Sequence, residues 1–280
     1  MNSEKHQFDL ERRLAKQRIK ELFDQNVRGR DPSEYVNRLI HAGSDGHWLQ
    51  VQFGLTADNK NAPDVFGFEL KTGSRGKTTF GDWSADQYLF YSHLRCQNSS
   101  VAASRCKKCS NSVMDRSTFL KTFGAPNPKK QNRNSWSGTV FPKISGWNRF
   151  GQKLDVERNG SIRTLYLFEE DKRPDKNLLV PKELRSGEVT TALWLATTLK
   201  KKVENKFKVL GWVKCVRDQN GEGPYRGLLF GNPIDFDLWV SLVRTGAVFL
   251  DSGMYDGNPR PYQQWRANNS VWDSLVEERY

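Results

Sequence analysis

Apolar positions in the first part of the chain recur with a helical period. Over residues 8–23 they fall at about every third or fourth place, and Lys and Arg fill most of the other places, which predicts an amphipathic helix. Two further helices are expected, one over residues 32–41 and one that begins after Ser44, a residue type that often caps helices.

The spacing of apolar residues changes near residue 65. Residues 65–72 alternate between two faces, which predicts a β-strand. Residues 96–138 then become polar and rich in Ser, Asn and Lys, which predicts a loop or insertion longer than an ordinary connection.

Strands and helices are mixed in the second half of the chain. Residues 153–158 and 161–168 flank Asn159-Gly160, a favoured two-residue turn, and predict a β-hairpin. A helix is expected over residues 188–207, and strands are expected over residues 209–216, 226–230 and 248–250. Another helix should start at Asp235 or Asp237 and end at Gly246. A loop over residues 253–269 should precede a last short helix. This mixture predicts an α/β or α+β fold.

Composition narrows the class of protein. The 280 residues suit one large domain or two small ones, and a hydrophobic content of 36% with nine Trp supports a sizeable core and excludes a disordered chain. The 44 Lys and Arg residues outnumber the 32 Asp and Glu residues, which gives a net charge of +12. Such a charge is typical of proteins that bind a polyanion, usually nucleic acid, although simple solubility is the alternative explanation.

Membrane and secretory classes do not fit the sequence. No stretch approaches the roughly 18 apolar residues of a membrane span, and the N-terminus lacks the apolar run of a signal peptide. The four Cys residues are too few for a disulfide framework, so we expect a reducing, cytoplasmic setting.

Residues 62–72, Ala-Pro-Asp-Val-Phe-Gly-Phe-Glu-Leu-Lys-Thr, carry the most informative chemical pattern. On a strand, Glu69 and Lys71 lie on one face and Leu70 on the other, while Asp64 arrives from just before. Two converging carboxylates suit Mg²⁺ bound together with substrate phosphates, and a nearby lysine can hold the attacking water. The alternative is a surface strand with an ordinary Glu–Lys pair.

The segment Pro63-Asp64…Glu69-Leu70-Lys71 matches the PD-(D/E)xK nuclease pattern, and residues 49–72 resemble the MutH-like and MvaI/BcnI-type endonucleases. This resemblance implies a restriction-endonuclease-like mixed central sheet flanked by helices. It also implies that Asp64 and Glu69 bind Mg²⁺ and that Lys71 serves the attacking water. Gln50 stands where such relatives often carry an acidic residue, and it can offer an amide oxygen but no charge.

The resemblance covers most of residues 45–275, and we expect one endonuclease domain over residues 1–280. Its expected parts are N-terminal helices (1–43), a catalytic core (44–92), a polar insertion (93–140), the rest of the sheet and helices (141–252), and a DNA-reading tail loop with a last helix (253–280).

The expected function is that of a type II restriction endonuclease. It would cut both strands of double-stranded DNA at a short specific site and leave 5′-phosphate ends. We expect a monomer or homodimer in a prokaryotic cell. A cognate DNA methyltransferase would be its functional partner. The alternatives are a MutH-like strand-nicking repair endonuclease and a non-catalytic, zinc-containing DNA-binding protein.

The polar insertion contains a candidate zinc site. His93 and Cys96 form one pair and Cys106 and Cys109 another, each with two intervening residues, which suits tetrahedral Zn²⁺ with one nitrogen and three sulfur ligands. A structural metal would order a segment with few apolar residues, and free surface thiols are the alternative. Cys215 alternates with Val213 and is expected in the core.

Two basic segments are candidates for DNA contact. Arg and Gln side chains can recognise base edges in the major groove, and the tail loop supplies Arg260, Gln263, Gln264 and Arg266. The insertion supplies Lys129, Lys130 and Arg133, which are expected to contact phosphates. A solvated surface is the alternative for both segments.

Overall fold

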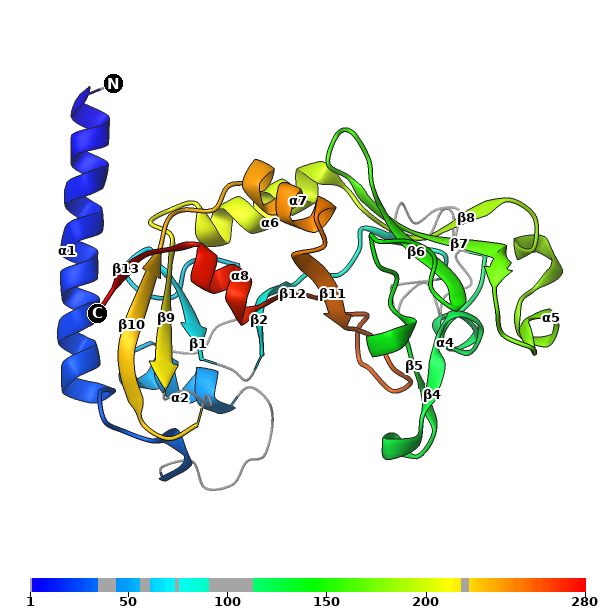
Figure 1. Cartoon of the computed structure of the whole chain (residues 1–280), viewed down its shortest axis with the longest axis horizontal. Coiled ribbons are helices and arrows are strands. Elements are labelled where there is room, and N and C mark those ends of the chain that lie inside the picture. Colours follow the sequence, from blue (N-terminus) through cyan, green and yellow to red (C-terminus); the bar gives the residue numbers. More distant parts are fainter. Residues whose placement is uncertain (1, 35–43, 56–60, 74–75, 91–112, 218–221) are drawn as a thin grey trace, which may run out of the picture. The chain divides into compact units, whose positions relative to one another are not determined.

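The structure is a computed structural model that describes residues 2–34, 44–55, 61–73, 76–90, 113–217 and 222–280. The chain divides into two compact units (Figure 1). Unit 1 comprises residues 1–78, 201–238 and 268–280, and unit 2 comprises residues 79–200 and 239–267. Among the described helices, none has the length and apolar character needed to span a membrane.

Unit 1 contains a four-stranded mixed sheet in the order β1-β9-β10-β13. Strand β1 (Glu69–Thr72) runs parallel to β9 (Trp212–Arg217), whereas β10 (Tyr225–Gly231) is antiparallel to both β9 and β13 (Val276–Arg279). Helices α1 (Asn2–Asn26) and α2 (Ser44–Gln52) contribute Ile19, Phe23 and Leu49 to a core with one face of this sheet.

Alternation along the strands separates an apolar face from a polar one. Leu70, Val213 and Cys215 belong to the core under α1 and α2, so the prediction for Cys215 is confirmed. The register pairs Glu69 with Trp212 and Lys71 with Lys214, so these side chains lie on the opposite face. That face packs against α8 (Asn269–Ser274), where the Trp212 and Trp272 rings lie 5.1 Å apart.

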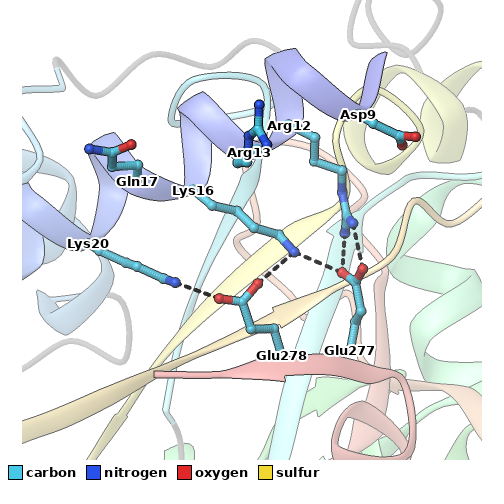
Figure 2. Close-up of a pocket in the computed structure, with 8 residues that line it drawn as sticks. All are labelled: Asp9, Arg12, Arg13, Lys16, Gln17, Lys20, Glu277 and Glu278. Atoms are coloured by element: carbon cyan, nitrogen blue, oxygen red, sulfur yellow. Dashed lines mark hydrogen bonds and ion pairs between the residues drawn. The ribbon is translucent and has the colours of Figure 1, made fainter. Parts of the chain in front are cut away.

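Ion pairs join side chains of α1 to side chains of the edge strand β13, as Figure 2 shows. The Arg12 guanidinium contacts Glu277 at 2.7 Å, and Lys16 lies 3.0 Å from Glu277 and 2.8 Å from Glu278. The Arg12 and Lys16 groups hold the pKa of Glu277 at about 2, so this carboxylate is charged at neutral pH. The contacts bring the first and last described elements of unit 1 together.

Unit 2 is built mainly from strands. A four-stranded antiparallel sheet has the order β3-β8-β7-β6, and a three-stranded sheet has the order β11-β12-β2, whose strand β2 begins in unit 1. The strands are β2 (Lys77–Asp82), β3 (Gln87–Tyr88), β6 (Phe150–Val156), β7 (Ile162–Asp171), β8 (Glu188–Trp194), β11 (Val248–Ser252) and β12 (Gln264–Asn268). The T-shaped ring contacts of Trp265 with Trp194 and Trp239 build part of its core.

Besides short 3₁₀ turns, four α-helices and one two-stranded pair remain among the described elements. They are α4 (Arg116–Phe123), the two-stranded pair β4 (Ala125–Asn127) and β5 (Arg133–Ser135), α5 (Lys176–Leu179), α6 (Ala196–Phe207) and α7 (Phe236–Arg244). Helices α6 and α7 each contribute residues to both units.

Several sequence predictions are confirmed. The helix over residues 8–23 is the middle of α1, the Asn159-Gly160 turn joins β6 to β7, and the strands expected near residues 209–216, 226–230 and 248–250 are β9, β10 and β11. Asp235 begins the next helix, because its carboxylate accepts a hydrogen bond from the Leu238 backbone N–H at 2.9 Å. Of the helix expected over residues 32–41, the structure describes only a 3₁₀ turn at Pro32–Glu34, and residues 35–43 lie outside the described chain.

The helix predicted over residues 188–207 is wrong in its first half. Residues 188–194 form β8, which pairs antiparallel with β7 from Ile162↔Trp194 to Leu167↔Glu188, and α6 starts only at Ala196. The run Val189-Thr190-Thr191 is β-branched and favours a strand, so the helical spacing of apolar residues applies only from Ala196 onward.

Three other boundaries differ from prediction. The strand expected over residues 65–72 begins at Glu69, because Phe66 and Gly67 have φ of +46° and +83° and form a turn closed by hydrogen bonds between Val65 and Phe68. The polar insertion contains α4, which Asp115 caps by accepting from Thr118 N–H at 2.7 Å. The tail loop becomes strand β12 at Gln264.

Candidate active site

Asp64 is held at the start of β1 by two hydrogen bonds. One carboxylate oxygen accepts from the Leu70 backbone N–H at 2.9 Å, and the other accepts from the Gln50 side-chain amide at 3.3 Å. The tight turn at residues 65–68 returns the chain toward Asp64, and α2 presents Gln50 from the other side. The structure therefore brings together two residues that are 14 positions apart in the sequence.

Glu69 and Lys71 lie side by side on the polar face of β1. Glu69 is 2% exposed and Lys71 is 8% exposed, and the Lys71 ammonium contacts the Glu69 Oε1 atom at 2.8 Å. The Lys206 ammonium, near the end of α6, contacts the same Oε1 atom at 3.0 Å. Glu69 Oε2 is buried and accepts no hydrogen bond from the described residues.

The electrostatics of the site follow from burial. Burial, and next the negative charge of Glu69, raise the pKa of Asp64 to about 6. Burial also lowers the pKa of Lys71, although the charge of Glu69 opposes that shift. The Lys71 ammonium lies 5.1 Å from the centre of the Phe207 ring and 5.9 Å from that of Trp272, so aromatic walls enclose it.

The donor set fits a divalent metal. A buried carboxylate oxygen without a hydrogen-bond partner is costly unless a cation or proton satisfies it, and Glu69 Oε2 is such an atom beside Asp64. No cluster of three or more His, Cys, Asp or Glu side chains suited to a metal occurs among the described residues. Two carboxylates alone suit Mg²⁺, which commonly takes its other ligands from water and substrate phosphate.

Lys206 is a further candidate site residue, which the sequence does not reveal. It follows the basic run Lys200, Lys201 and Lys202, which has the pattern of a solvated helix face. Only the folded chain brings the end of α6 to β1, and no motif in the sequence marks that contact.

The zinc candidates cannot be placed, because His93, Cys96, Cys106 and Cys109 lie outside the described residues. That site stays a prediction.

The tail-loop candidates for base recognition make contacts within unit 2. Arg260 pairs with Asp82 at 2.5 Å, and Arg266 pairs with Asp251 at 2.7 Å. Gln263 is fully buried, so its side chain faces no solvent in this structure, and Gln264 is half-buried at the start of β12. Their roles in DNA contact stay predictions.

The candidates from the insertion are more accessible. Lys129 and Lys130 are exposed on the turn between β4 and β5. The Arg133 guanidinium lies 3.4 Å from the centre of the Tyr255 ring, which holds it against the tail loop.

Comparison with known proteins supports the fold and the class. The family model described as LlaMI restriction endonuclease matches residues 29–280. The type II restriction enzyme ScrFI of Lactococcus lactis subsp. cremoris is 42% identical over 274 residues, which cover 94% of this chain and 97% of ScrFI. A solved structure of restriction endonuclease MvaI with its cognate DNA substrate is similar in fold, with a TM-score of 0.54 at 14% identity, and the match covers 96% of this chain and 97% of that chain.

These matches confirm the predicted restriction-endonuclease fold and the predicted enzyme class. The match with ScrFI spans nearly the whole of both chains, so it does not depend on the PD-(D/E)xK segment alone. This chain is a type II restriction endonuclease and belongs to the LlaMI restriction endonuclease family.

Proposed function

We propose that this endonuclease hydrolyses both strands of double-stranded DNA at a short specific site, using Mg²⁺ held by Asp64 and Glu69, and leaves 5′-phosphate ends. The observation that carries the proposal is Glu69 Oε2, a buried carboxylate oxygen without a hydrogen-bond partner among the described residues, beside a second carboxylate. When bound, the metal would supply Lewis-acid stabilisation of the charge that develops on the phosphate.

The side chains around the two carboxylates have distinct parts in this proposal. Lys71 and Lys206 both contact Glu69 Oε1, which leaves Oε2 for the metal. Gln50 orients Asp64 through the bond to its carboxylate. Because burial lowers its pKa, Lys71 gives up a proton more readily than a surface lysine does, and it would hold the attacking water in line with the phosphorus.

Cleavage of a supercoiled plasmid tests the proposal. With Mg²⁺ the protein should produce linear DNA, and excess EDTA should prevent the reaction. Run-off sequencing of the ends should map one short site with 5′ phosphates. Open-circle product that never becomes linear would favour the strand-nicking alternative, and cleavage that persists in EDTA would reject the metal-dependent mechanism.

Two associated predictions concern a partner enzyme and the oligomeric state. A nuclease of this class requires protection of the host DNA, so we propose a cognate DNA methyltransferase as its functional partner in the cytoplasm of a prokaryotic cell. Plasmid recovered from cells that express that methyltransferase should resist cleavage. The oligomeric state, monomer or homodimer, is measurable by sedimentation with and without DNA.

The zinc site proposed at His93, Cys96, Cys106 and Cys109 has a direct test. Protein purified without chelators should contain about one Zn²⁺ per chain, because the two pairs supply four ligands. Elemental analysis that finds no zinc would reject the site without affecting the Mg²⁺ proposal.

A further inference from the structure

The turn between β4 and β5 has an unusual backbone. Strands β4 and β5 pair from Ala125↔Ser135 to Asn127↔Arg133, and the Asn132 backbone N–H donates to the Asn127 carbonyl at 3.0 Å, which closes the turn. Gln131 and Asn132 both have φ of +55°. This left-handed conformation is uncommon for residues with a side chain, and here two such residues in succession reverse the chain at an exposed position between β4 and β5.

Strand β5 and the residue that follows it are bonded to the tail loop. The Asp256 N–H donates to the Asn134 carbonyl at 3.0 Å, and the Trp136 N–H donates to the Met254 carbonyl at 2.8 Å. Together with the Arg133 guanidinium over the Tyr255 ring, these bonds join the two basic segments that the sequence presents separately. Residues 125–135 and 254–256 therefore form one ribbon within unit 2.

Charge and accessibility distinguish the turn from the tail-loop candidates Arg260, Gln263 and Arg266. Lys129 and Lys130 are exposed immediately before Gln131 and Asn132, which are also exposed. By contrast, Arg260 and Arg266 are paired with carboxylates, and Gln263 is buried. The exposed amides thus stand beside two cations that can contact phosphates, and a two-stranded ribbon has the dimensions to enter the major groove.

We propose that Gln131 and Asn132 are specificity-determining residues, presented to a base-pair edge in the major groove while Lys129 and Lys130 contact the flanking phosphates. A carboxamide offers a donor and an acceptor together, so it suits an edge such as adenine N6 and N7, or adjacent acceptor and donor groups of neighbouring bases. The inference rests on the proposed function, because it requires that the protein bind a specific duplex site.

Glycine substitutions test these side chains without disturbing the turn. Gln131→Gly and Asn132→Gly remove the amides, and glycine accepts a φ of +55° without strain, so the fold should be retained and the melting temperature should change little. Lys129→Gln in the same turn is the matched comparison for a phosphate contact.

The measurement is competition binding in Ca²⁺ on the mapped site and on every single-base variant of it. Each glycine variant should lose about 5- to 150-fold of discrimination at one or two adjacent base pairs, the equivalent of about 1–3 kcal/mol, and keep discrimination elsewhere. Lys129→Gln should weaken binding to all sequences alike.

Two results would overturn the proposal: unchanged discrimination in both glycine variants, or equal losses on every sequence. The unaltered protein is assayed first. If it shows no Mg²⁺-dependent cleavage at a specific site, the proposed function fails. If it cleaves specifically and the glycine variants match it, only the role of the turn is rejected.

Discussion

The candidate active site of unit 1 and the candidate DNA-contacting ribbon of unit 2 use charged side chains in opposite ways. In unit 1, Glu69 and Lys71 are buried and bonded to each other. In unit 2, Lys129 and Lys130 are exposed on a turn. Burial shifts pKa values and fixes geometry, which chemistry at one phosphate requires, whereas exposed cations contact a long polyanion with little desolvation cost. The contrast predicts that variants in unit 1 affect cleavage and variants in unit 2 affect binding.

The largest effect is expected from the side chains that we propose to serve the metal and the attacking water. Asp64→Ala and Lys71→Met should each reduce cleavage at least about 100-fold, because each removes a group that we propose to act on the reacting atoms through the metal or the water. Binding of the specific site in Ca²⁺ should stay close to that of the unaltered protein. Single-turnover cleavage rates measure the effect, and normal rates in either variant would contradict the assignment.

A smaller effect is expected at Lys206. Lys206→Met removes a contact of 3.0 Å to Glu69, and a hydrogen bond to a charged group contributes about 1.5–3 kcal/mol, so cleavage should fall about 10- to 100-fold. Lys201→Met, an exposed position on the same helix, is the matched control and should cleave normally. Equal rates for the two variants would remove Lys206 from the site.

The next prediction compares the arginines of the tail loop, as candidates for base recognition, with a lysine that is a candidate for phosphate contact. If Arg260 or Arg266 leaves its carboxylate partner to contact a base, its replacement by Ala should cost about 1–3 kcal/mol of discrimination at one base pair. Lys130→Gln should instead lower the salt dependence of binding by about one unit, uniformly across sequences. Binding isotherms at two salt concentrations separate these outcomes. If an arginine variant loses the same affinity on every sequence, that arginine contacts only phosphates.

The smallest expected effect is that of pH on the Mg²⁺ concentration that cleavage requires. The pKa of Asp64 is raised to about 6 in the metal-free protein, so Asp64 is increasingly protonated below that pH and must lose a proton to bind metal. The Mg²⁺ concentration for half-maximal cleavage should therefore rise as pH falls through 6, approaching about tenfold per pH unit. A half-maximal concentration that stays constant between pH 7 and pH 5 would contradict a role for Asp64 as a ligand.

Local patterns predicted much of unit 1. The alternation around Glu69 and Lys71 placed both side chains on one face and Leu70 on the other, as the structure has them, because a strand has only two faces. The contact of Gln50 with Asp64 fits the expected neighbourhood of the motif. Lys206 was missed because its contact depends on how α6 ends against β1, which no local pattern encodes.

Unit 2 was harder to predict because its polar segments owe their structure to distant partners. Strand β5, which follows the turn of residues 128–132, is bonded to the tail loop about 120 residues later, and β8 is paired with β7. Local composition therefore indicates only a loop and a helix in these two segments. The burial of Gln263 has the same origin, since its backbone N–H and carbonyl bond to Asp82 and Trp83 at the far end of β2.

One variant tests the division between chemistry and recognition most directly. Glu69→Gln keeps the shape of the buried side chain but removes the charge that we propose to bind the metal. DNA binding by this variant and by the unaltered protein is compared in Ca²⁺, on the specific site and on its single-base variants. The account predicts no detectable cleavage with Mg²⁺ and undiminished discrimination among the sequences. Cleavage at the normal rate, or discrimination lost together with cleavage in a folded variant, would contradict it.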